Sequence, residues 1–256
     1  MSVTVGIALE RRAAGLVARV TIERPAKLNA LDGATLEGIA AALAGLPAGA
    51  RAVVLSGAGE RAFAGGADVN ELAALDERTA RAFIGRVHHA CAALRACPLP
   101  VIARVNGLCL GAGLELAAAC DLRIAAAHAQ FGMPEVRLGI PSVVEAALLP
   151  RLVGAGRARW LVLTGESIDA REALAWGLVE RVAAPGALDA QVDAALDALL
   201  AAGDAALRAQ KRLCKLWEEA PLEECVRASI DEFAAAYAGD EPRRLIGAFL
   251  AAKKKR

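Results

Sequence analysis

The stretch from residue 101 to residue 120 constrains the fold most, because an apolar strand pattern runs through glycines directly into a helical pattern. The β-branched run 101–105 is typical of a buried strand. Gly111 and Gly113 permit a tight turn with close backbone approach. The Ala- and Leu-rich run 114–120 then predicts a helix. The sequence therefore predicts a strand, a small-residue loop and a helix N-terminus in direct succession.

This helix N-terminus is a candidate site for negative charge, because the first amide groups of a helix have no partner within it. The segment lacks the G-x-G-x-x-G fingerprint of dinucleotide sites and the Gly-Lys-Ser/Thr of a phosphate-binding P-loop. An oxyanion hole with Glu115 beside it remains. So does plain packing of helix on sheet, with Glu115 simply favourable near a helix start. From this segment alone, both interpretations stay open.

A second loop repeats the design after the strand pattern 51–56. Small residues at 64–67 lead to a helix start, where Asp68 and Glu71 have the spacing of a capping box. Two loops of this kind can direct two backbone N–H groups at one atom, which is what an oxyanion hole requires.

The alternation of strand and helix patterns indicates an α/β fold. A hairpin is expected from the strand patterns 3–10 and 15–23. The last strand pattern covers 178–182, and only helical patterns follow it. We therefore divide the chain into an α/β core at 1–186 and a helical C-terminal region at 187–256, which is expected to act as a cap or an oligomer contact.

The composition argues against several classes of function. A length of 256 residues suits one large domain or a domain plus an appendage. A net charge of +1 gives no field that favours nucleic acid or a membrane surface. The six cysteines show no C-x-x-C pair and no His-rich spacing, so we expect buried, reduced thiols and no metal site. No secretory signal and no uncharged apolar run of membrane-spanning length is visible. A cytoplasmic protein is the expectation.

Two pairs of polar residues have a structural interpretation. His88 and His89 are adjacent in the amphipathic helix pattern 77–96, and adjacent residues do not share a helix face, so paired metal binding is not expected. Ser142 and Glu145 have capping-box spacing at the start of a later helical pattern, which favours capping for both. A contact of Ser142 with a polar substrate group and an acid role for Glu145 are the alternatives.

A series of short motifs extends over almost the whole chain. These motifs are ERPAKLNAL (23–31), AFAGGAD (62–68), PVIARVNG (100–107), GAGLELA (111–117), CD (120–121), FGMPE (131–135), LTG (163–165) and EALAWGLV (172–179). In this order they resemble the enoyl-CoA hydratase/isomerase, or crotonase, superfamily. The resemblance implies a spiral of ββα units with a C-terminal all-helical segment, assembled as a homo-trimer or a dimer of trimers. It also implies an acyl-CoA substrate and no separate cofactor.

The resemblance further implies which residues form the site. The backbone N–H groups of Ala67 and Ala112 would hold the thioester oxygen, and Glu115 and Glu135 would be the catalytic glutamates. Contacts with CoA are implied for Lys27, Leu28, Gly65, Ala67, Asp68, Val69 and Gly111. Lys27 would meet a phosphate or remain a solvated loop residue.

The implied reaction adds water to a 2-trans-enoyl-CoA and gives a 3-hydroxyacyl-CoA through an enolate held in the oxyanion hole. Glu135 is expected to activate the water, with Glu115 as its partner in handling the proton. In the loop that follows, Ser142 and Glu145 replace small residues common in hydratases. These two residues and Leu138 are therefore candidates for the acyl pocket.

Three alternatives stay open. A double-bond isomerase needs the oxyanion hole but can work with one glutamate, whereas this chain has both. Another crotonase reaction on a substituted acyl-CoA is compatible with the motifs, because a fold does not fix a function. A non-catalytic acyl-CoA-binding member would be favoured by loss of a glutamate, and neither glutamate is lost.

Overall fold

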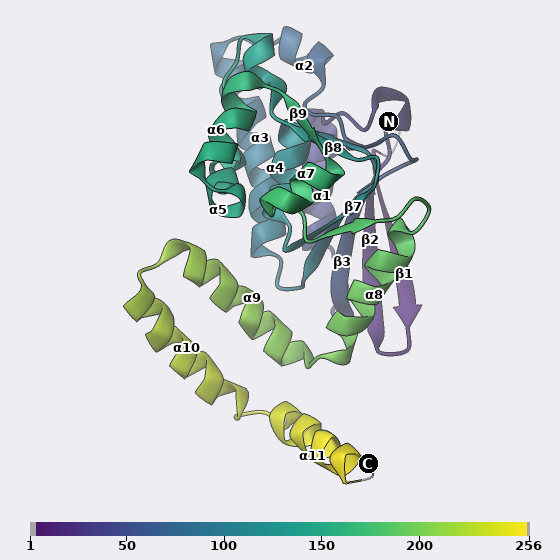
Figure 1. Cartoon of the computed structure of the whole chain (residues 1–256), viewed down its shortest axis with the longest axis vertical. Helices are drawn as coiled ribbons and strands as arrows, with labels where there is room; N and C mark the ends of the chain where they lie inside the picture. The colour runs from purple at the N-terminus through teal and green to yellow at the C-terminus, as the bar shows by residue number, and fades with distance from the viewer. Residues whose placement is uncertain (1–3, 255–256) are drawn as a thin grey trace.

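The computed structural model describes residues 4–254 and is built around a six-stranded sheet (Figure 1). In spatial order its strands are β1 (Val5–Arg12), β2 (Gly15–Ile22), β3 (Ala50–Gly57), β5 (Val101–Val105), β7 (Leu122–Ala126) and β10 (Arg181–Ala183). β1 and β2 form the predicted antiparallel hairpin, and the other neighbours are parallel. Residue 3 of the first predicted strand lies outside the described residues. The final strand begins at Arg181 rather than at 178, because Leu178 and Val179 are buried in the core before it.

A smaller, four-stranded sheet lies beside the first. Its strands are β4 (Ala62–Ala64), β6 (Leu108–Leu110), β8 (Gln130–Gly132) and β9 (Ser167–Asp169). β4, β6 and β8 are parallel, and β9 pairs antiparallel with β8. Each of the pairs β3–β4, β5–β6 and β7–β8 gives one strand to each sheet before the next helical segment. The predicted α/β spiral of ββα units is confirmed.

Two apolar cores cover the two faces of the larger sheet, because side chains alternate between faces along a strand. On β3, Val53 and Leu55 pack in the larger core, whereas Ala52 and Val54 pack in the smaller one. The helices that contribute to the larger core are α1 (Gly33–Ala44), α3 (Glu77–Ala96), α4 (Ala112–Ala119), α5 (Leu149–Val153), α6 (Ala155–Thr164) and α7 (Ala170–Trp176). The smaller core is closed by α8 (Leu188–Ala201), through Leu188, Val192, Leu196 and Leu200.

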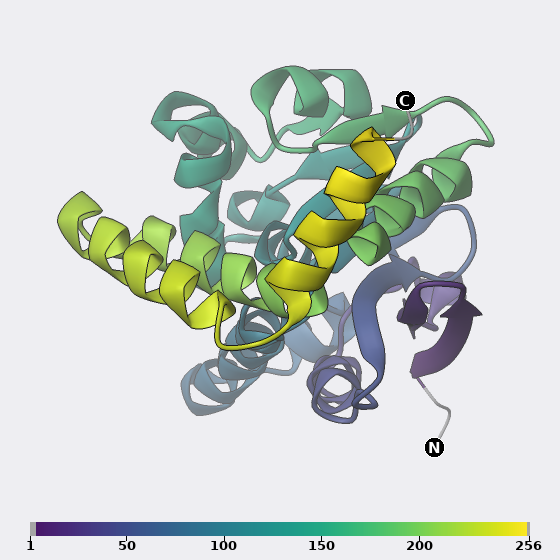
Figure 2. The same ribbon diagram turned by 90° about the horizontal axis from the view of Figure 1, so that it is seen from below.

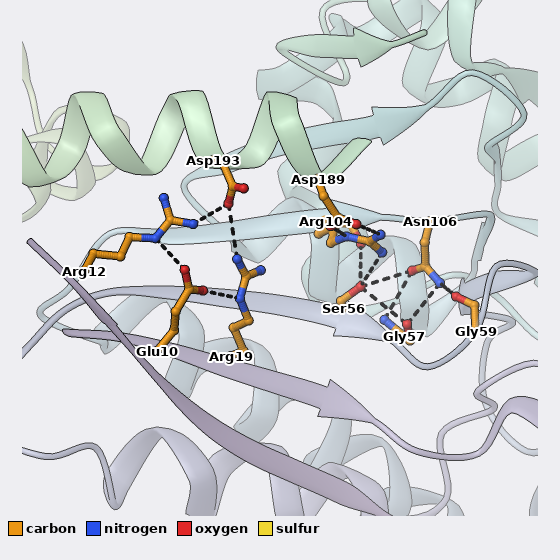
Figure 3. A network of polar contacts seen from close by, with 10 residues as sticks. All are labelled: Glu10, Arg12, Arg19, Ser56, Gly57, Gly59, Arg104, Asn106, Asp189 and Asp193. Carbon is orange, nitrogen blue, oxygen red and sulfur yellow. Dashed lines mark hydrogen bonds and ion pairs between the residues drawn. The ribbon is translucent and has the colours of Figure 1, made fainter. Parts of the chain in front are cut away.

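Charged side chains on the sheet also hold α8 in place (Figure 3). Arg104 on β5 forms an ion pair with Asp189, with its Nε 2.6 Å from the carboxylate. Arg12 and Arg19, from the hairpin, both reach Asp193 one helical turn further along. Apolar burial and these pairs together make α8 part of the core.

Three helices continue from α8 and extend away from the two sheets (Figure 1, Figure 2). They are α9 (Asp204–Glu219), α10 (Leu222–Ala236) and α11 (Glu241–Lys253). They carry exposed apolar side chains that include Trp217, Leu222, Ile230, Phe233 and Phe249. The domain boundary at residue 186 stays a prediction. In the structure α9 is still tied to the core, because Lys211 Nζ lies 2.7 Å from Asp121 Oδ2.

Asn106 fixes the turn between β3 and β4 against the end of β5 (Figure 3). Its side chain is fully buried, and its Nδ2 donates to the carbonyl oxygens of Gly57, Gly59 and Ala62 at 3.0, 2.6 and 3.1 Å. Its Oδ1 accepts from the Gly57 amide at 3.2 Å. One side chain thus satisfies the polar backbone of a buried turn, as burial demands. The start of β4 is therefore held in place relative to β5 and β6.

The capping box predicted at the start of α2 (Val69–Ala73) is wrong. Asp68 caps the helix by accepting from the Asn70 amide at 3.0 Å. Glu71 instead accepts from the Gly33 amide at 2.9 Å, at the start of α1. The open amides of a neighbouring helix N-terminus compete for a carboxylate within reach.

The cysteines are free thiols, and all are buried except Cys214, which is exposed. Within residues 4–254, no helix combines the length and apolar character needed to cross a membrane. In the same part of the chain, no group of three or more His, Cys, Asp and Glu side chains is placed to hold a metal ion.

Candidate active site

Three loops of the site leave the carboxyl ends of neighbouring parallel strands. β4 runs into residues 65–68, β6 into 111–113, and β8 into the short helix η2 (Pro134–Leu138). The amide of Gly111 donates to the carbonyl of Gly132 at 2.9 Å, which joins the second loop to the third. Because parallel strands end at one edge of their sheet, the three loops lie side by side.

Glycines permit the close contact between these loops. A Cβ at position 113 would collide with the Ala64 carbonyl oxygen and lie 2.8 Å from the Ala64 Cβ. Gly111 has φ +50, and a Cβ there would collide with the carboxyl group of Glu135. The predicted tight turn is confirmed, and it brings Glu135 against the start of α4.

The amides of Ala67 and Ala112 donate no intramolecular hydrogen bond in the described part of the chain. Leu31 donates to the Gly66 carbonyl at 2.8 Å, and Asp68 donates to the Leu31 carbonyl at 2.9 Å, so the Ala67 amide between them stays free. Ala112 is the first residue of α4, where helical amides lack an acceptor. Both residues line the same cavity. Two free N–H groups at a helix start and a nearby turn are suited to hold an oxyanion.

The cavity has a volume of 680 Å³ and combines an apolar wall with a few polar groups. The apolar wall comes from α2, the turn after it and α3, through Leu72, Leu75, Phe83, Ile84 and Val87. The expected site residues that line it are Gly65, Ala67, Val69, Gly111, Ala112, Glu115, Glu135 and Leu138. Such a lining can hold an apolar chain and direct its polar end at a few fixed groups.

Glu115 lies on α4 and is 4% exposed. Burial raises its pKa to about 8, the negative charges of Glu135 and Glu145 act in the same direction, and a hydrogen bond opposes them. The opposing bond comes from the Ala146 amide, which donates to Oε1 at 3.0 Å. At neutral pH this carboxyl group therefore retains its proton and can act as an acid.

Glu135 belongs to η2 and lines the cavity beside Gly111, the residue before Ala112. Ser142 donates a hydrogen bond to Glu135 Oε2 at 2.8 Å. The capping role predicted for Ser142 is wrong, because the following segment is the 3-10 helix η3 (Val144–Leu148), which begins after Val143 without a side-chain cap. The hydroxyl donates to a carboxylate oxygen, which is a strong charged acceptor, instead of accepting from a helix amide as a cap would.

Glu145 is also not a cap, and it does not line the cavity. It is 8% exposed, and its Oε1 lies 2.8 Å from His88 Nδ1 on α3. Ser142 does not line the cavity either, and its hydroxyl donates to Glu135; the acyl-pocket role considered for these two residues stays a prediction. Among the three acyl-pocket candidates, Leu138 lines the cavity.

The residues expected to contact CoA beyond the cavity form a charged cluster at its edge. Asp68 is 5% exposed, and its carboxylate lies 2.7 Å from Arg24 Nη2 and 3.4 Å from Lys27 Nζ. Burial would raise its pKa, but the bonds from Arg24 and Asn70 outweigh this and lower it to about 2. Leu28, with φ 53, accepts from the Gly65 amide at 2.8 Å. The cluster ties the first site loop to η1 (Pro25–Lys27).

Sequence reasoning missed three contributors to the site. Arg24 and His88 act through partners far along the chain, and no local spacing identifies such pairs. Asn106 was part of a quoted motif, but its role follows only from the fold. The apolar wall of α3 could have been found, because Phe83, Ile84 and Val87 share one face of the predicted amphipathic helix.

The chain was compared with known families and structures. A family model described as enoyl-CoA hydratase/isomerase matches residues 12–255. The crotonyl-CoA hydratase of Syntrophomonas wolfei is 36% identical over 237 residues, which cover 91% of each chain. The enoyl-CoA hydratase structure from Bacillus anthracis has a TM-score of 0.90 at 32% identity and covers 98% of this chain and 96% of that one. A Thermobifida fusca structure in complex with CoA has a TM-score of 0.81 at 35% identity, covering 91% and 93%.

Proposed function

This chain belongs to the enoyl-CoA hydratase/isomerase family, and we propose that it adds water to a 2-trans-enoyl-CoA to give the 3-hydroxyacyl-CoA. One observation carries the proposal: two free backbone amides and two glutamates line a single, mostly apolar cavity. The relatives named as hydratases and the CoA complex of a related structure support the substrate class.

The amides of Ala67 and Ala112 are proposed to hold the thioester oxygen. When the oxygen of water bonds to C3, the electron pair of the double bond moves toward the carbonyl and leaves an enolate. The two amides stabilise the negative charge on that oxygen, and removal of one such donor typically costs roughly 3 kcal/mol. The enolate then takes a proton at C2.

The two glutamates are proposed to divide the proton transfers. Glu135 takes a proton from the attacking water as its oxygen bonds to C3. Glu115, whose raised pKa of about 8 leaves it protonated at neutral pH, gives a proton to C2. The two carboxyl groups end with their protonation exchanged, so a proton returns from Glu135 to Glu115 before the next turnover. The sum of these steps is the addition of one water.

The contacts with the acyl chain and with a CoA phosphate are proposed from the positions of the residues around the cavity. The apolar wall of α3 would hold the acyl chain, with Leu138 at the opposite side. Lys27, whose side chain is 55% exposed, would reach a phosphate of CoA while Asp68 keeps it near the first site loop. No cofactor other than the CoA of the substrate takes part in this scheme.

An assay with crotonyl-CoA tests the proposal, through the loss of the ultraviolet absorbance of the conjugated thioester. Glu115→Gln and Glu135→Gln should each lower kcat by at least about 100-fold. Glu166→Gln is the matched control, since this side chain is exposed and does not line the cavity. Full activity in either site variant would contradict the shared mechanism. No loss of absorbance, with turnover of a 3-enoyl-CoA instead, would indicate an isomerase.

A homo-trimer or dimer of trimers is proposed for the assembly, and a cytoplasmic location stays a prediction. The assembly is supported by the apolar side chains of α9 and α10, which line a hollow of 740 Å³. A surface of this kind usually marks a protein contact. Light scattering should give a mass that is a multiple of three chains, and Phe233→Glu should reduce it. A monomeric wild-type protein would contradict the proposal.

A further inference from the structure

We propose that Glu145, anchored to His88, is a positioning residue that orients Glu115 and places a negative charge beside it. The inference deepens the proposed function, and its expected effect on kcat rests on that function. The arrangement of the groups themselves comes from the packing of η3 between α3 and α4.

Glu145 has one paired and one unpaired carboxylate oxygen. Oε1 lies 2.8 Å from His88 Nδ1, whereas Oε2 is buried and has no hydrogen-bond partner among the described residues. A buried carboxylate oxygen without a partner is costly, so its retention calls for an explanation. The His88 side chain is 60% exposed, so the pair links a buried acid to the surface of α3.

The backbone beside Glu145 is strained in a way that serves Glu115. Val144 has φ 41, a left-handed conformation that is unfavourable for a β-branched residue and costs about 1–3 kcal/mol. This conformation lets Glu145 turn toward α3 while the next amide, of Ala146, donates to Glu115 Oε1 at 3.0 Å. Such strain persists only where neighbouring contacts hold it, and the contact with His88 is one of them.

The effect of Glu145 on Glu115 depends on the titratable groups that lie around it. From α4 it faces Glu115, and from α3 it faces His88 and the buried thiol of Cys91. α5 adds only the apolar Leu149 and Val153 to this interior, since Arg151 on the same helix is exposed. Burial raises the pKa of Cys91, and the charges of Glu145 and Glu115 raise it further, so this thiol stays neutral.

A fixed negative charge on Glu145 therefore disfavours the ionised form of Glu115. Like charges in one buried site cannot all ionise together, and the group that keeps its proton is the one able to donate it. In the proposed reaction that proton goes to C2. Glu145 thus acts on catalysis without touching the substrate, which distinguishes it from Glu115 and Glu135.

The test is a titration of the glutamate carboxyl groups by carbon-13 NMR, without substrate, in wild type and Glu145→Gln. Glu115→Gln assigns the resonance. Removing the charge should move the titration of Glu115 to lower pH by about one unit, a tenfold change in proton affinity. In parallel, the alkaline limb of the kcat profile should move the same way, with kcat at pH 8 reduced about fivefold and KM within about twofold.

His88→Ala tests the same inference by a substitution at an exposed position. His89→Ala, on the same helix, is its matched control. The first should move the Glu115 titration in the direction of Glu145→Gln, and the second should leave it in place. An unchanged titration in either Glu145→Gln or His88→Ala, in a protein that unfolds at the wild-type temperature, would overturn the inference. If the titration moves but wild type does not hydrate enoyl-CoA, only the proposed function fails.

Discussion

Ser142 donates a hydrogen bond of 2.8 Å to Glu135 Oε2, and Ala146, four residues later, donates one of 3.0 Å to Glu115 Oε1. One short segment therefore orients both glutamates of the site. It does so with two kinds of donor, a rotatable hydroxyl for Glu135 and a fixed backbone amide for Glu115. A side-chain substitution can remove the first bond but not the second.

Ser142→Ala should lower kcat about tenfold, because a hydrogen bond to a charged group is worth about 1.5–3 kcal/mol and the carboxylate would lose its orientation. KM should change less than about twofold, since the serine does not line the cavity. Steady-state kinetics with crotonyl-CoA measure both constants. Ser229→Ala, at a half-buried position of α10 that does not line the cavity, is the control. A loss confined to KM would mean that Ser142 contacts the substrate instead.

Glu115→Gln should stabilise the protein at alkaline pH while it abolishes activity. Because burial raises the pKa of Glu115 to about 8 from its ordinary value of 4.5, the unfolded chain releases this proton first. The resulting loss of stability is absent below pH 4.5, grows as pH rises, and is complete above about 8. It amounts to on the order of 4 kcal/mol.

The measurement is thermal or urea unfolding of wild type and Glu115→Gln at several pH values. The variant should gain most over wild type at pH 8–9 and least at pH 4. Glu166→Gln, exposed in both states, should show no such trend. A constant difference between the two proteins across this range would contradict the raised pKa.

Gly113→Ala should separate the first two loops of the site, because the new Cβ would collide with the Ala64 carbonyl oxygen. The expected result is a loss of kcat of roughly 100-fold or more, since the two amides would no longer hold one oxygen. Gly156→Ala is the matched control: this helical glycine has no atom within 4 Å of an added Cβ. Equal activity of the two variants would argue against the proposed oxyanion hole.

The local parts of this site could be predicted from the sequence because they depend on local chemistry. Gly111 and Gly113 predict a tight turn after a buried strand. A turn that leads into a helix leaves the first helical amides without partners, whichever residues surround it. The parallel strands then place the two loops together. Family motifs added Glu135, whose position relative to the turn depends on a third strand.

The contacts made at long range could not be predicted. Ser142 and Glu145 had the spacing of a helix cap, and that local interpretation failed because carboxylate and imidazole partners from η2 and α3 were within reach. Glu71 failed as a capping residue for the same reason. Local spacing shows which hydrogen-bond partners a polar side chain could have. The tertiary fold decides which of them it binds.

Asp68→Asn should destabilise the protein by about 2 kcal/mol, because it leaves the largely buried Arg24 without its closest counter-charge. The pKa of Asp68 is lowered to about 2, so its contribution to stability is present above its ordinary pKa of 3.8 and is lost as pH falls through 2. The difference from wild type should therefore be full at pH 7 and shrink below pH 4, as urea unfolding would show. Lys27→Ala removes only an exposed partner at 3.4 Å and should cost about 0.5 kcal/mol or less. If both variants lose the same stability, Arg24 is not the partner that matters.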